Sequence, residues 1–178
     1  MEIFKTRLEG LFLIVPTIYE DNRGMFFETY NKNYFAKAGI NDEIFQENES
    51  FSKKGVIRGL HFQVRPFEQG KIISVVRGNI KDVVVDIREN SSTYGQWESF
   101  SLNSKEKMSL YVPRGFAHGF LALEDSVLNY KITTPYNKAS ESGIIWNDLS
   151  LNIDWGISNP ILSEKDKNLS SFKDYRHY

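Results

Sequence analysis

The chain has 178 residues, of which 40% are hydrophobic and 14% aromatic, and its formal net charge is −1. This length allows a proper core in one domain, and the near-neutral charge excludes a strong attraction to nucleic acid or to an anionic membrane. The absence of cysteine excludes disulfides and thiolate metal sites. The apolar run Leu11–Val15 is too short for a signal sequence or a membrane span. We therefore expect one cytoplasmic domain over residues 1–178, with no membrane or nucleic-acid partner.

Short runs typical of β-strands recur along the chain with turn signals between them, which favours an all-β sandwich or barrel. A short helix is expected over Asn31–Ala38, ended by Gly39, and a helical turn over Ser163–Leu169 with Ser163 as its N-cap. The expected strands are Leu11–Val15, Met25–Tyr30, Glu43–Glu47, Val56–Gln63, Lys71–Arg77, Ile80–Ile87, Trp97–Leu102, Ser109–Val112, Phe116–Leu121 and Val127–Thr133.

The run from 80 to 88 alternates between apolar and charged residues over most of its length. One face of this expected strand carries apolar residues and the other mostly charged ones: Val83, Val85 and Ile87 against Asp82, Asp86 and Arg88, with Val84 among the latter. The apolar face belongs to a core. The charged face either meets water with ordinary ion pairs or lines a polar pocket.

Ionisable side chains occur inside other expected strands, which is unusual unless the groups are paired or used. Strand parity places Arg58 and His61 on opposite faces, although a bulge at Gly59 would bring them together. Lys71 opens the next run, and His118 lies within Phe116–Leu121. These residues point to a polar pocket inside a β-rich fold.

Each of these residues also has an ordinary structural interpretation. A lone histidine on an apolar face is more often structural than catalytic, Lys71 suits the edge of a strand, and Tyr130 suits a core. A metal site is the sharper rival for His61 and His118. The clustered spacing typical of histidine ligands is missing, so we expect no metal.

Taken together, these segments resemble the nucleotide-sugar 3,5-epimerases, the family typified by dTDP-4-dehydrorhamnose 3,5-epimerase. The matching segments follow in order over nearly the whole chain. They are Asp21-Asn22-Arg23-Gly24 with Phe26, Phe27 and Glu28; Phe45-Gln46-Glu47-Asn48; Arg58-Gly59-Leu60-His61-Phe62-Gln63; Gln69-Gly70-Lys71; Asp82 to Arg88; Pro113-Arg114-Gly115-Phe116-Ala117-His118-Gly119-Phe120; Tyr130-Lys131; Glu141 to Asp148; and Leu162 to Asp166.

The resemblance implies a cupin-like jelly roll (a double-stranded β-helix sandwich) with a few short helices, without metal or cofactor. It implies a homodimer that exchanges N-terminal segments, and a dTDP-linked 4-keto-6-deoxyhexose as substrate, in dTDP-rhamnose and polysaccharide biosynthesis. His61 matches the base, supported by Asp166; Tyr130 matches the acid, and Lys71 stabilises the enolate. The implied substrate contacts are Arg23, Glu28, Gln46, Glu47, Asn48, Arg58, Gln63, His118, Glu141 and Lys165.

The chemistry suits these residue types. Removing a hydrogen next to a ketone needs a base whose pKa is near neutral, as that of histidine is, and a carboxylate partner fixes the histidine tautomer. Charge then develops on the ketone oxygen, where a cation such as Lys71 helps most. The rival hypotheses are epimerisation at one carbon, ketoisomerisation, and sugar-nucleotide binding without catalysis.

Overall fold

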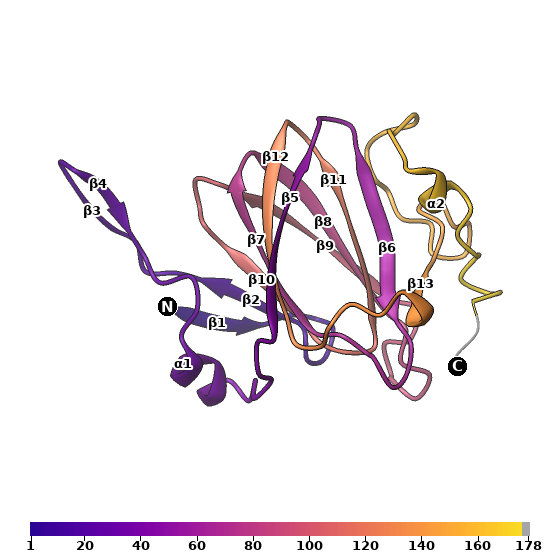
Figure 1. The fold of residues 1–178 in the computed structure, drawn as a ribbon, viewed down its shortest axis with the longest axis horizontal. Helices are drawn as coiled ribbons and strands as arrows, with labels where there is room; N and C mark the ends of the chain where they lie inside the picture. Colours follow the sequence, from indigo (N-terminus) through magenta and orange to yellow (C-terminus); the bar gives the residue numbers. More distant parts are fainter. Residues whose placement is uncertain (176–178) are drawn as a thin grey trace.

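The computed structural model describes residues 1–175, and its main feature is a pair of facing β-sheets (Figure 1). A two-stranded hairpin projects from the sheets. Within the described range the helical segments are short: α1 (Lys32–Lys37), the 3-10 turn η1 (Lys138–Ser140) and α2 (Glu164–Lys167). This architecture confirms the predicted all-β sandwich of jelly-roll type with a few short helices.

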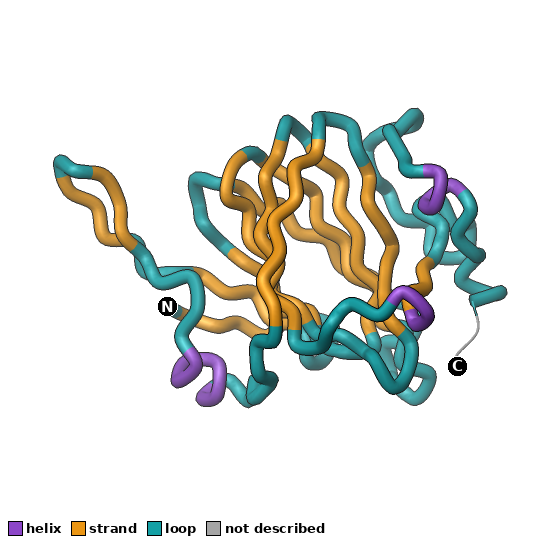
Figure 2. The backbone as a smooth tube through the Cα atoms, viewed as in Figure 1, coloured by secondary structure: helices purple, strands orange, loops and turns teal. Residues whose placement is uncertain are grey.

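The larger sheet has the strand order β1-β2-β10-β7-β12-β5, and the smaller sheet has the order β13-β6-β11-β8-β9. Figure 2 shows the strands in orange and the loops that join them in teal. All pairings inside both sheets are antiparallel. The strands of the larger sheet are β1 (Glu2–Lys5), β2 (Phe12–Val15), β5 (Gln46–Ser52), β7 (Lys71–Arg77), β10 (Ser109–Val112) and β12 (Ser126–Ile132). Those of the smaller sheet are β6 (Ile57–Gln63), β8 (Asn79–Asp86), β9 (Trp97–Asn103), β11 (Phe116–Ala122) and β13 (Glu141–Gly143).

The main core lies between the two sheets. Ile73 and Leu128 from the larger sheet belong to one buried cluster with Val84 and Phe120 from the smaller sheet. Each fully buried side chain of this size contributes roughly 1.5–3 kcal/mol relative to exposure in water. The residues of this cluster therefore identify the face of each strand that points inward.

A second core covers the outer face of the smaller sheet. Val83 and Val85 of β8 pack there in one cluster with Trp155 and Tyr175 from the C-terminal segment 144–175. The indole Nε1 of Trp155 donates to the backbone oxygen of Trp146 at 2.7 Å, so the covering segment is tied to itself by a satisfied polar group. The smaller sheet is thus buried on both faces, unlike the half-exposed sheet that simple alternation suggests.

The expected strands that became β2 and β6 to β12 have bounds within one residue of the observed ones. Two others were placed wrongly. In the run 25–30 the strand β4 ends at Phe26, the last residue that pairs with β3. The strand expected over 43–47 begins at Gln46 and continues to Ser52. The polar sequence of β5 has weak strand preference, and its pairing with β12 decides its structure. The short strands β1, β3 and β13 were not predicted.

Both predicted helices occur, with the expected caps. The Asn31 side chain accepts from the backbone N–H of Asn33, and Gly39 after α1 has φ +85°, which favours glycine. The Ser163 hydroxyl accepts from the backbone N–H of Asp166 at 3.0 Å, although α2 ends at Lys167 rather than Leu169.

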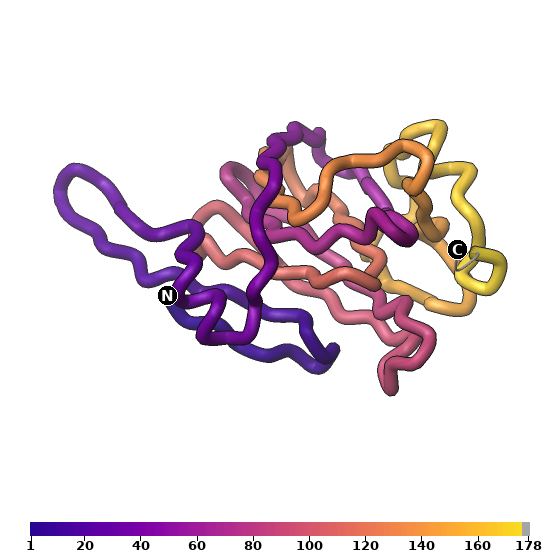
Figure 3. Tube along the Cα trace, turned by 60° about the horizontal axis from the view of Figure 1, so that its bottom comes forward, coloured from indigo at the N-terminus to yellow at the C-terminus, as the bar shows by residue number. Residues whose placement is uncertain are grey.

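The hairpin of β3 (Tyr19–Asp21) and β4 (Gly24–Phe26) projects away from both sheets in two views (Figures 1 and 3). Its turn falls at residues 21–24. Tyr19 and Phe26 leave 63% and 69% of their surface exposed, so the hairpin carries uncovered aromatic rings. No helix among the described residues is long and apolar enough to cross a membrane.

Candidate active site

A β-bulge in β6 places Arg58 and His61 on one face. His61 pairs with His118 of β11, and Arg58 pairs with Phe120, so the two residues between His61 and Arg58 on β6 oppose the single residue Gly119 on β11. Gly59 in the bulge has φ +119°, and a Cβ there would lie 2.5 Å from the Cα of Gly119. Cross-strand partners share a face, and Phe120 points into the main core. The bulge considered from the sequence is therefore confirmed, and both side chains point inward.

His61 is coupled to Asp166 of α2. The His61 Nε2 lies 2.6 Å from the Asp166 Oδ1, and the two side chains are 30% and 4% exposed. Burial raises the pKa of the Asp166 carboxyl, but the hydrogen bond with His61 and its charge outweigh this and hold that pKa below its usual value. An ionised carboxylate thus orients an imidazole that solvent still reaches. This is the pairing that a histidine base requires.

His118 and Asp82 form a second, deeper pair. The His118 Nε2 lies 2.8 Å from the Asp82 Oδ2, and both side chains are buried. Asp82 shares its face with Val84, which is part of the main core. Of the two interpretations of the charged face of this strand, the polar interior is the correct one. Asp86 is likewise buried and bound to Arg88, not exposed to water.

Lys71 and Tyr130 approach the same interior from the larger sheet. They lie on the inward faces of β7 and β12, in register with Ile132 and Ile73 respectively. Burial lowers the pKa of Lys71 to about 8, although the charges of Asp82 and Glu141 oppose that effect. Burial raises the pKa of Tyr130 to about 12, while the Ser50 hydroxyl donates to its oxygen at 3.2 Å. Tyr130 is therefore protonated at neutral pH.

The edge strand β5 adds polar groups beside Tyr130. Asn48 pairs with Tyr130 in register, and Gln46 two residues before it lies on the same face, where its amide donates to the Asn48 oxygen at 2.7 Å. Arg58 reaches toward this strand and donates to the Ser52 hydroxyl at 2.9 Å and to the Phe51 backbone oxygen at 3.0 Å. Gln46, Asn48 and Arg58 are solvent-accessible, so a ligand can reach them.

Glu141 and Lys165 stand beside His61. Glu141 lies on β13, in register with Gln63, and thus on the face of β6 that carries His61. Its Oε1 lies 2.5 Å from the Lys165 Nζ, and its Oε2 accepts from the Tyr136 hydroxyl at 2.9 Å. Burial raises the pKa of the Glu141 carboxyl, but Lys165 and Tyr136 outweigh it and keep that pKa low.

Two further side chains expected to contact the substrate, Glu47 and Gln63, are bonded to other parts of the protein. Glu47 alternates with Gln46 and Asn48 and points to the opposite face of β5, where it bonds Lys131 at 3.0 Å and Asn129 at 2.7 Å. The buried Gln63 amide is used by backbone groups of the loops at 67 and 135–137. In the single chain Glu47 lies on the outer surface and Gln63 anchors loops, and their expected contact with substrate stays a prediction.

Arg23 lies in the turn of the projecting hairpin, and Glu28 follows two residues after β4 (Figure 1). Arg23 pairs with Asp21 at 2.5 Å, and Glu28 accepts from the Asn31 side chain at 2.9 Å. The single chain does not bring these two residues to His61.

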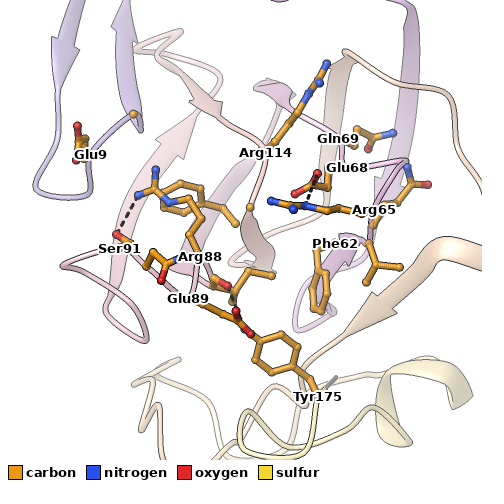
Figure 4. A pocket seen from close by; sticks show the side chains of 17 residues that line it. Glu9, Phe62, Arg65, Glu68, Gln69, Arg88, Glu89, Ser91, Arg114 and Tyr175 are labelled. Atoms are coloured by element: carbon orange, nitrogen blue, oxygen red, sulfur yellow. Dashed lines mark hydrogen bonds and ion pairs between the residues drawn. The ribbon is translucent and has the colours of Figure 1, made fainter. Parts of the chain in front are cut away.

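A cavity of about 860 Å³ lies apart from this site (Figure 4). It lies by the loops at 64–69, 87–91 and 114–116, and of the predicted site residues only Gln63 lines it. Its arginines are largely paired: Arg65 with Glu68 at 3.5 Å, and Arg88 with Asp86 at 2.7 Å. The cavity is therefore lined by other residues than the inward-facing group of His61, His118, Lys71 and Tyr130.

No group of three or more metal-binding side chains occurs among residues 1–175.

Three polar residues of this site were not assigned from the sequence: Asp82, Ser50 and Tyr136. The alternation of apolar and charged residues in β8 could have indicated Asp82, whereas no sequence pattern points to Ser50 or Tyr136.

Comparison with known proteins identifies the family. Residues 5–174 match the family model described as dTDP-4-dehydrorhamnose 3,5-epimerase. The chain belongs to this family. The family member from Shigella flexneri, named dTDP-4-dehydrorhamnose 3,5-epimerase, is 42% identical over 100% of this chain and 99% of its own length. The crystal structure of the Elizabethkingia anophelis enzyme of the same name superposes with a TM-score of 0.95 at 46% identity, covering 100% of this chain and 99% of the other.

Two further family members bear on the substrate. A Legionella pneumophila epimerase solved in complex with dTDP-4-keto-L-rhamnose has a TM-score of 0.94 at 40% identity, covering 98% of this chain and 94% of that one. A 3'-monoepimerase from Streptomyces bikiniensis, solved with dTDP-quinovose, has a TM-score of 0.88 at 32% identity, over 93% and 85% of the two chains. Members of this family are isomerases that act on nucleotide sugars.

Proposed function

We propose that this protein inverts C3 and C5 of a dTDP-linked 4-keto-6-deoxyhexose, the conversion of dTDP-4-dehydro-6-deoxyglucose to dTDP-4-dehydrorhamnose. The observation that carries the proposal is the placement of two proton-transfer groups on opposite sheets. His61 points inward from β6 and Tyr130 points inward from β12. A sugar held between the sheets meets a base on one side and an acid on the other, which is what inversion requires.

In the proposed mechanism His61 removes the proton next to the ketone. Asp166, at 2.6 Å from the imidazole, holds one tautomer and stabilises the imidazolium that forms. Lys71 then stabilises the enolate, since a cation acts most strongly where charge develops in a poorly solvated site. Tyr130 returns a proton from the opposite face. A phenol whose pKa is raised to about 12 is fully protonated before the reaction and can donate to a more basic enolate carbon.

Two groups of side chains are proposed to bind the substrate. Asn48, Gln46 and Arg58 are accessible beside Tyr130, and Glu141 with Lys165 stands beside His61. Arg58 and Lys165 are the cations available for a diphosphate, because guanidinium and ammonium groups are the usual partners of phosphate oxygens. His118, which is hydrogen-bonded to Asp82, points into the same interior.

We further propose a homodimer in which the hairpin completes the partner's site. The support is that Arg23 and Glu28 match family substrate contacts, yet Arg23 lies at the tip of a projecting hairpin with exposed aromatic rings and Glu28 follows that hairpin. Refolded mixtures of Arg23→Ala and His61→Asn would test this. Heterodimers make half of such a mixture and carry one intact site each, so about a quarter of wild-type activity should return. No recovery would count against the exchange.

The proposed function is tested by incubating the purified protein with dTDP-4-dehydro-6-deoxyglucose and resolving the products by NMR. Epimerisation at both carbons is expected, and none with His61→Asn. Tyr34→Phe, on the exposed side of α1, serves as the unaffected control. The likeness to the Streptomyces bikiniensis 3'-monoepimerase keeps a second candidate, inversion at one carbon, which the same spectra distinguish. Cytoplasmic location, a single domain over 1–178 and a role in polysaccharide biosynthesis stay predictions.

A further inference from the structure

Asp82 is an ionisable residue that takes no part in the proton transfers of the proposed mechanism. It lies on β8, an interior strand of the smaller sheet, in register with Phe120 of β11 and Phe100 of β9. Its side chain is fully buried and points between the sheets, on the face shared with Ile80 and Val84. Carboxylates almost never occupy such a place unless they are paired or serve a function.

The carboxylate is only half satisfied. Its Oδ2 contacts the His118 Nε2 at 2.8 Å, whereas its Oδ1 is buried and has no hydrogen-bond partner among the described residues. Leaving a charged oxygen unpaired in a core is costly, and such groups in native proteins usually mark a functional demand. Asp86 on the same strand differs in this respect, because both of its oxygens accept hydrogen bonds, from Arg88, Ser91 or Thr93.

We propose that Asp82 is a positioning residue for the epimerisation: its Oδ2 fixes the His118 ring, and its uncompensated charge keeps Lys71 cationic until the enolate forms. This inference rests on the proposed function. Lys71 forms no ion pair within 4.0 Å of any carboxylate among residues 1–175, so only longer-range charge stabilises its ammonium. A cation left unpaired in this way is free to meet the ketone oxygen.

The charges that act on Lys71 come from two strands, Asp82 on β8 and Glu141 on β13, with Asp82 the stronger. Tyr130 on β12, His61 on β6 and His118 on β11 line the same interior. Burial alone pulls the pKa of Lys71 downward, and the two carboxylates limit that fall to about 8. Without the Asp82 charge, Lys71 would lose its proton at a lower pH, and the site would lose its enolate stabiliser in the physiological range.

Asp82 also acts on Tyr130, whose pKa it raises after the larger effect of burial. Neutralising Asp82 therefore makes the phenol slightly more acidic, but from a starting value of about 12 it stays protonated over the assay range. The two effects separate by pH, and the alkaline limb of the profile belongs to Lys71.

The test compares Asp82→Asn with wild type and with Asp86→Asn, a matched buried aspartate on the same strand. The alkaline limb of kcat should move to lower pH by about one unit in Asp82→Asn. In Asp86→Asn it should stay in place while Tm falls. Glu141→Gln should move the limb less than Asp82→Asn does.

A second readout does not depend on activity. Trace acetylation of the native protein with acetic anhydride over a pH series, quantified by mass spectrometry, yields the apparent pKa of Lys71, with the exposed Lys54 as internal reference. The wild-type value should be about 8 and the Asp82→Asn value lower. An unchanged Lys71 titration overturns the inference even in an active enzyme. An inactive wild type with a shifted titration contradicts the proposed function alone. If neither Asp82→Asn nor Asp82→Ser folds, Asp82 serves the core and the inference fails.

Discussion

Replacing Tyr130 by phenylalanine removes one hydroxyl and leaves the ring, which makes it the sharpest test of the proposed acid. The ring packs against the main core of β7 and β12, and Phe keeps that packing. The hydroxyl lost is bonded to Ser50 at 3.2 Å, which is longer than the usual range for an O–H···O bond. The structure therefore predicts a small stability change and a large change in proton delivery.

The two magnitudes follow from these contacts. A single neutral hydrogen bond contributes about 0.5–1.5 kcal/mol, and the long Ser50 contact places the loss in unfolding free energy at about 0.5 kcal/mol. Removing a general acid typically slows the step it serves by about 10²–10⁴-fold. Proton abstraction by His61 does not use the phenol, so exchange of substrate hydrogen with solvent should be slowed much less than product formation.

The assay follows both processes in one sample. Substrate is incubated in deuterated water, and NMR measures deuterium in the recovered substrate and the amount of epimerised product. In Tyr130→Phe the ratio of exchange to product should rise about tenfold or more over wild type. Equal slowing of both processes would refute the acid role, and a fall in Tm with normal turnover would identify Tyr130 as a core residue only.

Three further predictions concern the base, its partner and metals. His61→Asn should slow both hydrogen exchange and product formation by about 10²–10⁴-fold in a folded protein, and near-normal turnover would remove His61 from the mechanism. Asp166 has a lowered pKa in the folded state, so it contributes stability above its unfolded pKa near 3.9, and that contribution is lost as pH falls through the folded value. Asp166→Asn should therefore lower Tm at pH 7, with a gap to wild type that closes below about pH 4, whereas a gap independent of pH would contradict the ionised partner. Exhaustive chelation should leave turnover unchanged, and a loss that one divalent metal restores would overturn the metal-free prediction.

Strand periodicity was enough to predict most of the sandwich, because β7 and β8 carry long apolar or alternating runs. It failed at β5, where a polar sequence becomes a strand only through its register with β12. That failure had a consequence at the site. Once the bounds of β5 are known, parity places Glu47 on the face of the strand opposite to Gln46 and Asn48, a separation that the sequence alone did not predict.

The site itself depends on contacts that spacing cannot encode. His61 and Asp166 are 105 residues apart, and their 2.6 Å contact depends on how α2 folds back beside β6. The common face of Arg58 and His61 required a bulge that the sequence permitted at Gly59 without requiring it. The alternation of β8 left the environment of Asp82 open, because the C-terminal segment that buries the outer face of its sheet lies far along the chain.

The central claim is that one interior, with its base and acid on opposite sheets, inverts two carbons through enolates. The most direct measurement is the position of deuterium in the product that the wild-type protein forms from dTDP-4-dehydro-6-deoxyglucose in deuterated water. The account predicts deuterium at both C3 and C5 of the product. Product that carries deuterium at neither carbon, or at only one of them, would contradict it.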